Sequence, residues 1–274
     1  MFDLLAVANN YRQWSRSMEY AAALCRLLDA SLTGIFVSEP IVPIPAMNTP
    51  LAFPEIYTIS GDAARDACAA GPEFLCWAAA RGVARAQWVV AEGYLEQTLA
   101  QAANWHDLLV LESGRESPLG APATLGQIVL TCGVPCLLIP DSYAGQPGFD
   151  TIAIAWNGSV ESVRALHAAL PLLRRARSLV LIHGERIEPF SSVDWKPPFT
   201  LDGYLAQHRL DATHRRCEAK ADASGAELLR IAQDTGADLL VMGAYGRSRF
   251  SEWMLGGATR HVFEAANLPV LMRH

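Results

Sequence analysis

The chain has 274 residues, of which 51% are hydrophobic and 18% charged, and its formal net charge is −6. That length and apolar content allow one large domain or two small ones with sizeable cores. The acidic balance, without any run of lysine and arginine, excludes a protein built to attract nucleic acid or an anionic membrane surface. No apolar run reaches 18 residues and no signal peptide is visible, so we expect a cytoplasmic protein.

The six cysteines form no C-x-x-C pair, and most of them stand in apolar runs: Cys25, Cys68, Cys76, Cys132, Cys136 and Cys217. We interpret them as small buried hydrophobic residues in a reducing compartment. Metal ligands at a recognisable spacing are absent from the sequence, so no metal site is expected.

In the first half, short apolar runs alternate with helical patterns. Strands are expected at residues 3–8, 32–37, 87–91, 108–111 and 136–139. Helices are expected at residues 16–29, 61–84 with a break at Gly71-Pro72, 95–104 and 125–131. Five prolines between residues 38 and 60 indicate a long loop, whose apolar side chains either pack against the other half or bind something.

A polar segment rich in turn residues, at 141–148, is interpreted as a linker. After it, the order of strands and helices seen in the first half is repeated. Strands are expected at residues 151–155, 179–182, 214–218, 239–242 and 270–272. Helices are expected at residues 159–173, 201–208, 223–233 and 259–266.

The two halves also match residue by residue. The run Asp-Leu-Leu-Val occurs twice, 131 residues apart, at the start of the fourth strand of each half. At an offset of 147, Asn10 falls on Asn157 and Ser31 falls on Ser178, so that no gap is needed between the first two strands. Repeated element order together with these matches favours a duplicated domain, with chance alignment of apolar strands as the alternative.

The sequence therefore predicts an α/β protein made of two tandem doubly wound, Rossmann-like domains with five parallel strands each, at residues 1–143 and 149–274. In such sheets, ligands lie beyond the carboxyl ends of the strands, at the point where the strand order reverses.

The stretch after the strand at 239–242 carries the most specific signal. Gly243 and Gly246 follow the strand, and Gly256 and Gly257 precede a helical pattern. Glycine lets a backbone approach a ligand closely, and the first N–H groups of a helix attract anions. Arg247 adds positive charge, so a phosphate is the expected guest; turn and helix-cap chemistry is the alternative.

This spacing resembles the nucleotide signature of universal stress proteins, G-x2-G-x9-G-[ST], with Gly257 in place of the final Ser or Thr. The segment at 155–159, Ala-Trp-Asn-Gly-Ser, also resembles the end of that family's first strand, where Asn157 replaces a usual Asp. The resemblance covers nearly the whole chain and implies a tandem member with strand order 3-2-1-4-5 in each half. It further implies antiparallel pairing of the two fifth strands as an intramolecular pseudo-dimer, which could pair again as a homodimer.

In nucleotide-binding members of that family, the glycine loop holds the ribose and phosphates, and the end of the first strand lies beside the adenine. By that similarity, the residues that would bind ATP, ADP or AMP, with Mg²⁺ for a triphosphate, are Asn157, Gly184, Gly243, Gly246, Arg247, Gly256, Gly257, Ala258 and Thr259. Gly257 cannot supply the usual hydroxyl, whose hydrogen bond to a charged oxygen is worth roughly 1.5–3 kcal/mol. The hydroxyl of Thr259 or Ser248 is a candidate substitute.

The corresponding loop of the first half is unsuited to phosphate. Pro122 has no N–H to donate, and Glu112 and Glu116 would repel an anion. We therefore expect that the first half has lost the site and serves as a structural partner.

The sequence offers no convincing catalytic arrangement of nucleophile and base, so we expect a binding protein that at most hydrolyses ATP slowly. Ser159 reads as a helix N-cap, and His183 is the one histidine that stands at a strand end beside the expected site. The resulting hypothesis is a stress-response regulatory protein that binds an adenine nucleotide. The alternatives are a protein of the same fold that binds another small molecule or a partner protein, and an adenylyl-transfer enzyme, whose S-G-G-x-D-S and H-x-G-H motifs are missing.

Overall fold

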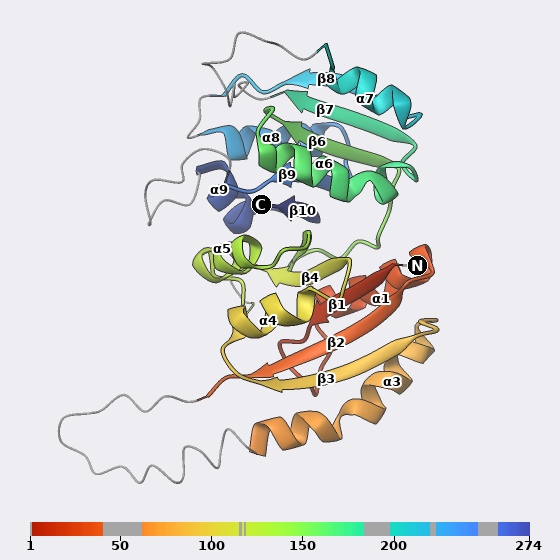
Figure 1. Ribbon diagram of the computed structural model, residues 1–274, viewed down its shortest axis with the longest axis vertical. Helices are drawn as coiled ribbons and strands as arrows, with labels where there is room; N and C mark the ends of the chain where they lie inside the picture. The colour runs from red at the N-terminus through yellow and green to blue at the C-terminus, as the bar shows by residue number, and fades with distance from the viewer. Residues whose placement is uncertain are drawn as a thin grey trace, which may run out of the picture.

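The computed structural model describes residues 2–40, 62–114, 117, 119–183, 198–219, 223–245 and 257–274. In these residues, ten strands form one continuous sheet with helices on both faces (Figure 1). The strands are β1 (Asp3–Val7), β2 (Ser31–Ser38), β3 (Ala86–Glu92), β4 (Leu108–Ser113), β5 (Cys136–Pro140), β6 (Thr151–Trp156), β7 (Ser178–His183), β8 (Thr213–Arg216), β9 (Leu239–Gly243) and β10 (Val270–Arg273). The helices with defined bounds are α1 (Arg16–Leu28), α3 (Gly71–Ala80), α4 (Leu95–Ala103), α5 (Pro122–Thr131), α6 (Val160–Leu173), α7 (Leu201–Gln207), α8 (Ser224–Asp234) and α9 (Gly257–Ala265).

The strand order is β3-β2-β1-β4-β5-β10-β9-β6-β7-β8, which repeats the predicted order 3-2-1-4-5 in each half. Neighbouring strands are parallel within each half, and β5 and β10 join the halves as an antiparallel pair, with Leu138 opposite Val270. This confirms the fold class and the antiparallel pairing of the fifth strands. The division of the chain at residues 143 and 149 stays a prediction.

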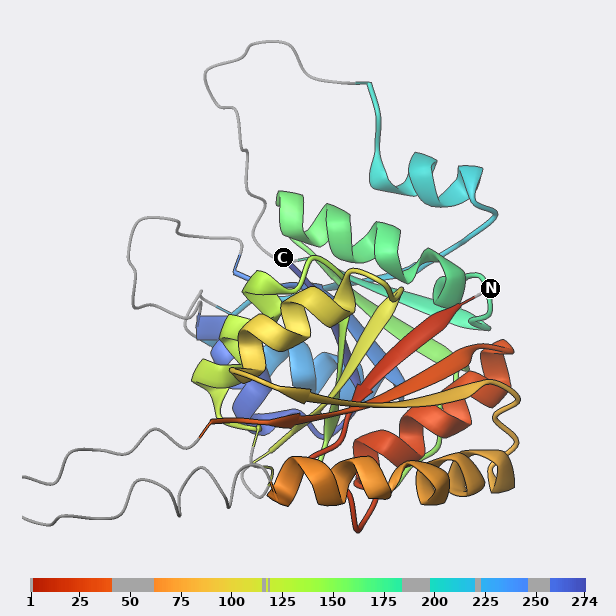
Figure 2. The ribbon, with the colours of Figure 1, turned by 60° about the horizontal axis from the view of Figure 1, so that its bottom comes forward.

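The strands are apolar because helices cover both faces of the sheet. Leu4 and Ile154 face one layer, which includes side chains of α1 and α6, and Leu5 and Val180 face the other, which includes side chains of α4, α5, α8 and α9. Figure 2 shows α1 and α3 on one side of β2 and β3, and α4 on the other side. The carboxyl ends of the strands are thereby left as the edge where loops meet.

The alignment of the two halves needs one correction. Leu108 and Leu239 are equivalent, and their partners across the sheet are Leu4 and Ile152, which stand 148 residues apart rather than 147. A slip of one residue turns every side chain of a strand to the opposite face, so the strand pairing decides the alignment. The residue equivalent to Asn157 is therefore Asn9 and not Asn10.

Several element boundaries follow from proline. The predicted break at Gly71-Pro72 is confirmed, because a helix over residues 62–69 ends there and α3 begins, with Pro72 in its first turn. Helix α5 begins at Pro122, earlier than the expected residue 125, since proline suits the first position of a helix. Of the predicted proline-rich loop, residues 41–60 lie outside the described residues.

The prediction that the cysteines are buried is only partly right. Cys25, Cys132 and Cys136 are buried and Cys217 is half-buried, but Cys68 and Cys76 are exposed because they lie on the solvent side of residues 62–69 and of α3. Among the described residues, none of the helices combines the length and apolarity needed to cross a membrane.

Candidate functional site

The candidate site lies at the carboxyl ends of β6 and β9, which pair in the centre of the second half. After β6 the chain turns at Asn157, whose side-chain Oδ1 accepts a hydrogen bond from the Ser159 N–H at 3.1 Å. Ser159 then caps α6, because its Oγ accepts a hydrogen bond from the Ser162 N–H at 3.2 Å. The predicted N-cap is confirmed, and the amide nitrogen of Asn157 is the part of its side chain left to offer to a ligand.

Gly243, the last residue of β9, allows α6 to lie directly against the strand. A Cβ on Gly243 would stand 2.5 Å from the Ser162 nitrogen and 2.6 Å from the Glu161 carbonyl carbon. Real Cβ atoms do not make contacts this short, so only glycine fits here. Close helix–strand packing is also the role of the third glycine in dinucleotide-binding fingerprints. Gly243 thus shapes the wall of the crevice.

A hydrogen bond joins the two ends of the glycine stretch, which runs from Gly243 to Gly257. The Tyr245 N–H donates a hydrogen bond to Thr259 Oγ1 at 3.4 Å, so the chain leaving β9 is held against the first turn of α9. Tyr245 has a φ of 66°, a left-handed conformation that is uncommon for a residue with a side chain. Its buried hydroxyl has no hydrogen-bond partner among the described residues, and burial raises its pKa. A constrained backbone of this kind is typical of functional loops.

Helix α9 begins at Gly257 and points its first N–H groups toward this loop. It lies close to α8, and the contact requires glycine at position 225. A Cβ on Gly225 would stand 2.8 Å from the Ala258 carbonyl oxygen. Thr259 is only 4% exposed, and its hydroxyl already accepts the Tyr245 N–H, so its role in the described structure is to brace the loop. The hydroxyl proton remains available as a donor.

The structure therefore gathers at one end of the sheet those predicted site residues that it describes: Asn157, Gly243, Gly257, Ala258 and Thr259. The others lie outside the described residues: Gly184, Gly246, Arg247 and Gly256. The substitute hydroxyl of Ser248 and the carboxylate of Glu116 are outside them as well.

The equivalent place in the first half is filled by a carboxylate. Glu112 stands at the sheet position of Gly243, and its Oε2 accepts hydrogen bonds from Asn9 Nδ2 at 3.2 Å and from Ser17 Oγ at 3.4 Å. Asn9 also donates to Ser117 Oγ at 3.2 Å. Glu112 is 8% exposed, and this burial raises the pKa of its carboxyl group. A phosphate in this crevice would meet the Glu112 carboxylate instead of free N–H groups.

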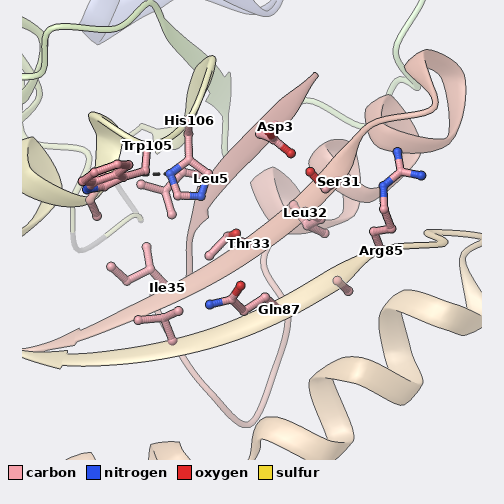
Figure 3. Close-up of a pocket in the computed structure, with 13 residues that line it drawn as sticks. Asp3, Leu5, Ser31, Leu32, Thr33, Ile35, Arg85, Gln87, Trp105 and His106 are labelled. Carbon is pink, nitrogen blue, oxygen red and sulfur yellow. Dashed lines mark hydrogen bonds between the residues drawn. The ribbon is translucent and has the colours of Figure 1, made fainter. Parts of the chain in front are cut away.

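A second concave feature lies elsewhere in the first half, at the amino ends of β1, β2 and β3. It is a groove of about 530 Å³, bounded on one side by Trp105 and His106, which follow α4 (Figure 3). Trp105 is 83% exposed. His106 Nδ1 lies 2.9 Å from the Ala102 carbonyl oxygen and so donates to it, which leaves Nε2 as an acceptor. Figure 3 places the His106 ring above Leu5 and Thr33 in the groove.

This groove was not predicted from the sequence, although the repeat contains a signal for it. At the offset of 131 between the two halves, Trp105 and His106 correspond to Gly236 and Ala237. The second half makes the same turn with two small residues, so the fold does not require an indole and an imidazole there.

The sequence profile of the universal stress protein family matches residues 148–274. Among curated relatives, universal stress protein MJ0577 of Methanocaldococcus jannaschii is 39% identical over 46 residues, which are 17% of this chain and 28% of the relative. Universal stress protein Slr1230 of Synechocystis sp. is 24% identical over 196 residues, which are 69% of this chain and 66% of the relative. The matched regions therefore span less than two thirds of either relative.

A solved structure extends the likeness to both halves. The crystal structure of a universal stress protein from Archaeoglobus fulgidus superposes with a TM-score of 0.69 and covers 99% of this chain and 97% of its own. Its 14% sequence identity supports a shared fold and nothing finer. Residues 148–274 are therefore similar in sequence to the universal stress protein family, and the fold of both halves is similar to that of a solved universal stress protein.

Proposed function

We propose that this chain is a stress-response regulatory protein that binds one adenine nucleotide in the crevice of its C-terminal half. The observation that carries the proposal is the position of the glycine stretch. It leaves β9 at the point where the strand order reverses and returns at the first turn of α9, and the Tyr245–Thr259 hydrogen bond holds both ends together. Free N–H groups at a helix start and a close backbone are suited to phosphates.

The described residues around the crevice carry charges of both signs, because Glu161, which is buried, lies in the first turn of α6 against Gly243. Arg260 in α9 is paired with Glu264 along the helix at 2.9 Å, so its charge is largely committed there. The backbone N–H groups, and Arg247 in the part of the loop that is not described, are then the main attraction for phosphate. We therefore expect ATP, ADP or AMP as the ligand, with Mg²⁺ accompanying a triphosphate.

The proposal assigns binding and no catalysis. Among the described residues of the crevice, Ser159 and Ser162 use their side chains to hold the first turn of α6, and no imidazole lies within hydrogen-bond distance of either hydroxyl. Any hydrolysis of ATP is expected to be slow, since general acid–base groups in place usually contribute a 10²–10⁴-fold acceleration.

Isothermal titration calorimetry with ATP, ADP and AMP tests the proposal. Gly246→Val should abolish binding, because a branched side chain would obstruct the backbone approach that the phosphates need. Gly133→Val is the matched control, since the nearest atom to a Cβ at Gly133 is 4.0 Å away, in the first half. Absence of binding at millimolar nucleotide, or unchanged affinity in Gly246→Val, would remove the proposal.

The groove beside Trp105 favours a second candidate function, the binding of a different small molecule. A rim of indole and imidazole over a pocket of ordinary ligand size is suited to a planar molecule with hydrogen-bonding edges. Native mass spectrometry of the purified protein separates the two candidates. A bound mass that disappears only in Trp105→Ala supports the groove, and one that disappears only in Gly246→Val supports the nucleotide crevice.

A further inference from the structure

Four of the seven histidines gather in one layer of the second half, around α7. His183 ends β7, His214 lies in β8, His208 follows the last residue of α7, and His167 lies in α6. His183 pairs with Trp156 in the sheet, beside the Asn157 turn, while the side-chain contacts of the other three histidines are with residues of β7, α7 and the end of α6. Histidine is the side chain whose ordinary pKa allows a change of charge between pH 5 and 8, so such a cluster makes packing sensitive to acid.

The first turn of α7 is attached to the sheet through a chain of three side chains. Asp202 Oδ1 lies 3.3 Å from His214 Nε2, and His214 Nδ1 lies 2.6 Å from His183 Nε2. The carboxylate favours a proton on His214 Nε2, so His214 Nδ1 accepts from His183. The two rings are also stacked, with centroids 4.8 Å apart.

This His–His contact can hold only one proton between the two facing nitrogens. If both rings become imidazolium ions, both nitrogens carry a proton, and two donors cannot remain 2.6 Å apart. Two positive charges would also repel each other across the stacked rings. The contact therefore requires that at least one of the two rings stays neutral.

The other end of α7 depends on a neutral histidine in the same way. Arg174 Nη2 lies 3.1 Å from His208 Nδ1. A guanidinium group can only donate, so His208 Nδ1 must be an unprotonated acceptor. Protonation of His208 would set two cationic donors against each other. Acid thus opposes the attachment of α7 at both of its ends.

The remaining surroundings do not cancel this effect. The charged and titratable side chains beside the cluster are Asp202 and Tyr204 on α7, His167 on α6 and Arg174 at its end, and Arg215 and Arg216 on β8. Arg209 and Asp211 stand in the turn between α7 and β8. Apart from the carboxylates of Asp202 and Asp211, these groups are cationic or neutral near pH 6. Burial first, and then His214, lower the pKa of His183 from its ordinary value of 6.5, while Asp202 acts in the opposite direction.

The first half provides an internal comparison, because the described residues of the same layer there include no histidine. By strand register, Trp88 stands at the position of His214. Helix α3 is attached through Glu19, which accepts hydrogen bonds from Trp77 Nε1 at 3.3 Å and from Arg81 Nη2 at 2.6 Å. The repeated fold can therefore hold this helix without histidine.

We propose that α7 is an acid-released element: protonation of the His183–His214 pair and of His208 detaches it from the sheet, while α3 in the first half stays in place. Release would uncover Leu205, which is 1% exposed, and the apolar side of β7 beneath it. The device acts on the second half alone and does not require a bound nucleotide.

Backbone amide exchange measured by NMR at pH 7.5 and pH 5.5, with correction for the intrinsic rates, tests the proposal on the full chain. Protection of the amides in α7 should fall at least ~tenfold at the lower pH, because the ordinary histidine pKa of about 6.5 lies between the two pH values. Protection in α3 should change much less.

The double variant His208→Gln/His214→Gln keeps acceptors at both places but removes their titration, so its α7 should remain protected at pH 5.5. His261→Gln, in α9, is the matched control and should behave as the wild type. Protection of α7 that survives pH 5.5 in the wild type would overturn the proposal. An equal loss of α7 protection at pH 5.5 in the double variant would also overturn it. Protection of α7 in the double variant at pH 7.5 shows that this variant is folded.

Discussion

Asn9 donates a hydrogen bond to Glu112 across 3.2 Å, at the two sheet positions that Asn157 and Gly243 occupy in the other half. One copy of the fold thus closes its crevice with its own carboxylate, while the other presents a glycine at the same place. The two halves share strand order and differ in what their crevices can accept.

The first prediction concerns the cost of that carboxylate. Burial raises the pKa of Glu112, so the folded state binds its proton more readily than the unfolded state does. Stability then falls as the pH rises through the unfolded pKa toward the folded one. Glu112→Gln should therefore be at least as stable as the wild type at pH 7, with a relative advantage that shrinks as the pH falls through the raised pKa of Glu112 and is lost below pH ~4.5. Urea unfolding at both pH values measures this, and a less stable variant at pH 7 would contradict it.

The second prediction concerns the packing role of Gly243. In Gly243→Ala the new methyl group would stand 2.5 Å from the Ser162 nitrogen, so α6 must move or the strand must bend. The expected loss is about 1–3 kcal/mol of unfolding free energy, as for overpacked sites. Gly133→Ala, which meets nothing closer than 4.0 Å, serves as the control in the same urea titration. Equal stability of the two variants would mean that the strand and helix are not held this tightly.

The third prediction concerns the brace between Tyr245 and Thr259. Thr259→Val keeps the shape of the buried side chain but leaves the Tyr245 N–H without its acceptor, at a cost of about 1–3 kcal/mol in stability. Thr259→Ser retains the hydroxyl and should lose less. Thermal or urea unfolding compares the two variants, and the account of the brace fails if the valine variant is the more stable one.

The fourth prediction concerns the missing hydroxyl at Gly257, and it rests on the proposed nucleotide site. Gly257 is exposed and is the first residue of helix α9, a place in the chain that serine readily occupies. A hydrogen bond to a charged phosphate oxygen is worth roughly 1.5–3 kcal/mol, so Gly257→Ser should bind ATP about 10- to 150-fold more tightly. Calorimetry measures the change, and an unchanged or weaker affinity would argue that the phosphates lie elsewhere.

Much of the fold could be predicted because its signals are local. Buried strands, the Ser159 cap and the helix break at Pro72 each depend on a few consecutive residues. The offset of β1 against β6 could not be predicted in this way, since both strands are short and apolar and the wrong offset of 147 gives more identities than the correct offset of 148. Only the pairing of Leu4 with Leu108 and of Ile152 with Leu239 decides it.

The histidine layer could not be predicted from the sequence, for a different reason. His183, Asp202 and His214 come from β7, α7 and β8, and nothing in their spacing indicates that their side chains meet. Their contact depends on strand register and on the position of α7. The Trp105–His106 rim could have been noticed, because aligning the halves at an offset of 131 sets it against two small residues, Gly236 and Ala237.

The number of nucleotides bound per chain tests the central claim most directly. Equilibrium dialysis of the full-length protein against ATP, up to millimolar concentration, should reach one nucleotide per chain, with the Gly246→Val variant binding none. If two nucleotides bind per chain, the assignment of a closed crevice around Glu112 is wrong. If the protein binds none, the assignment of an open crevice beside α9 is wrong.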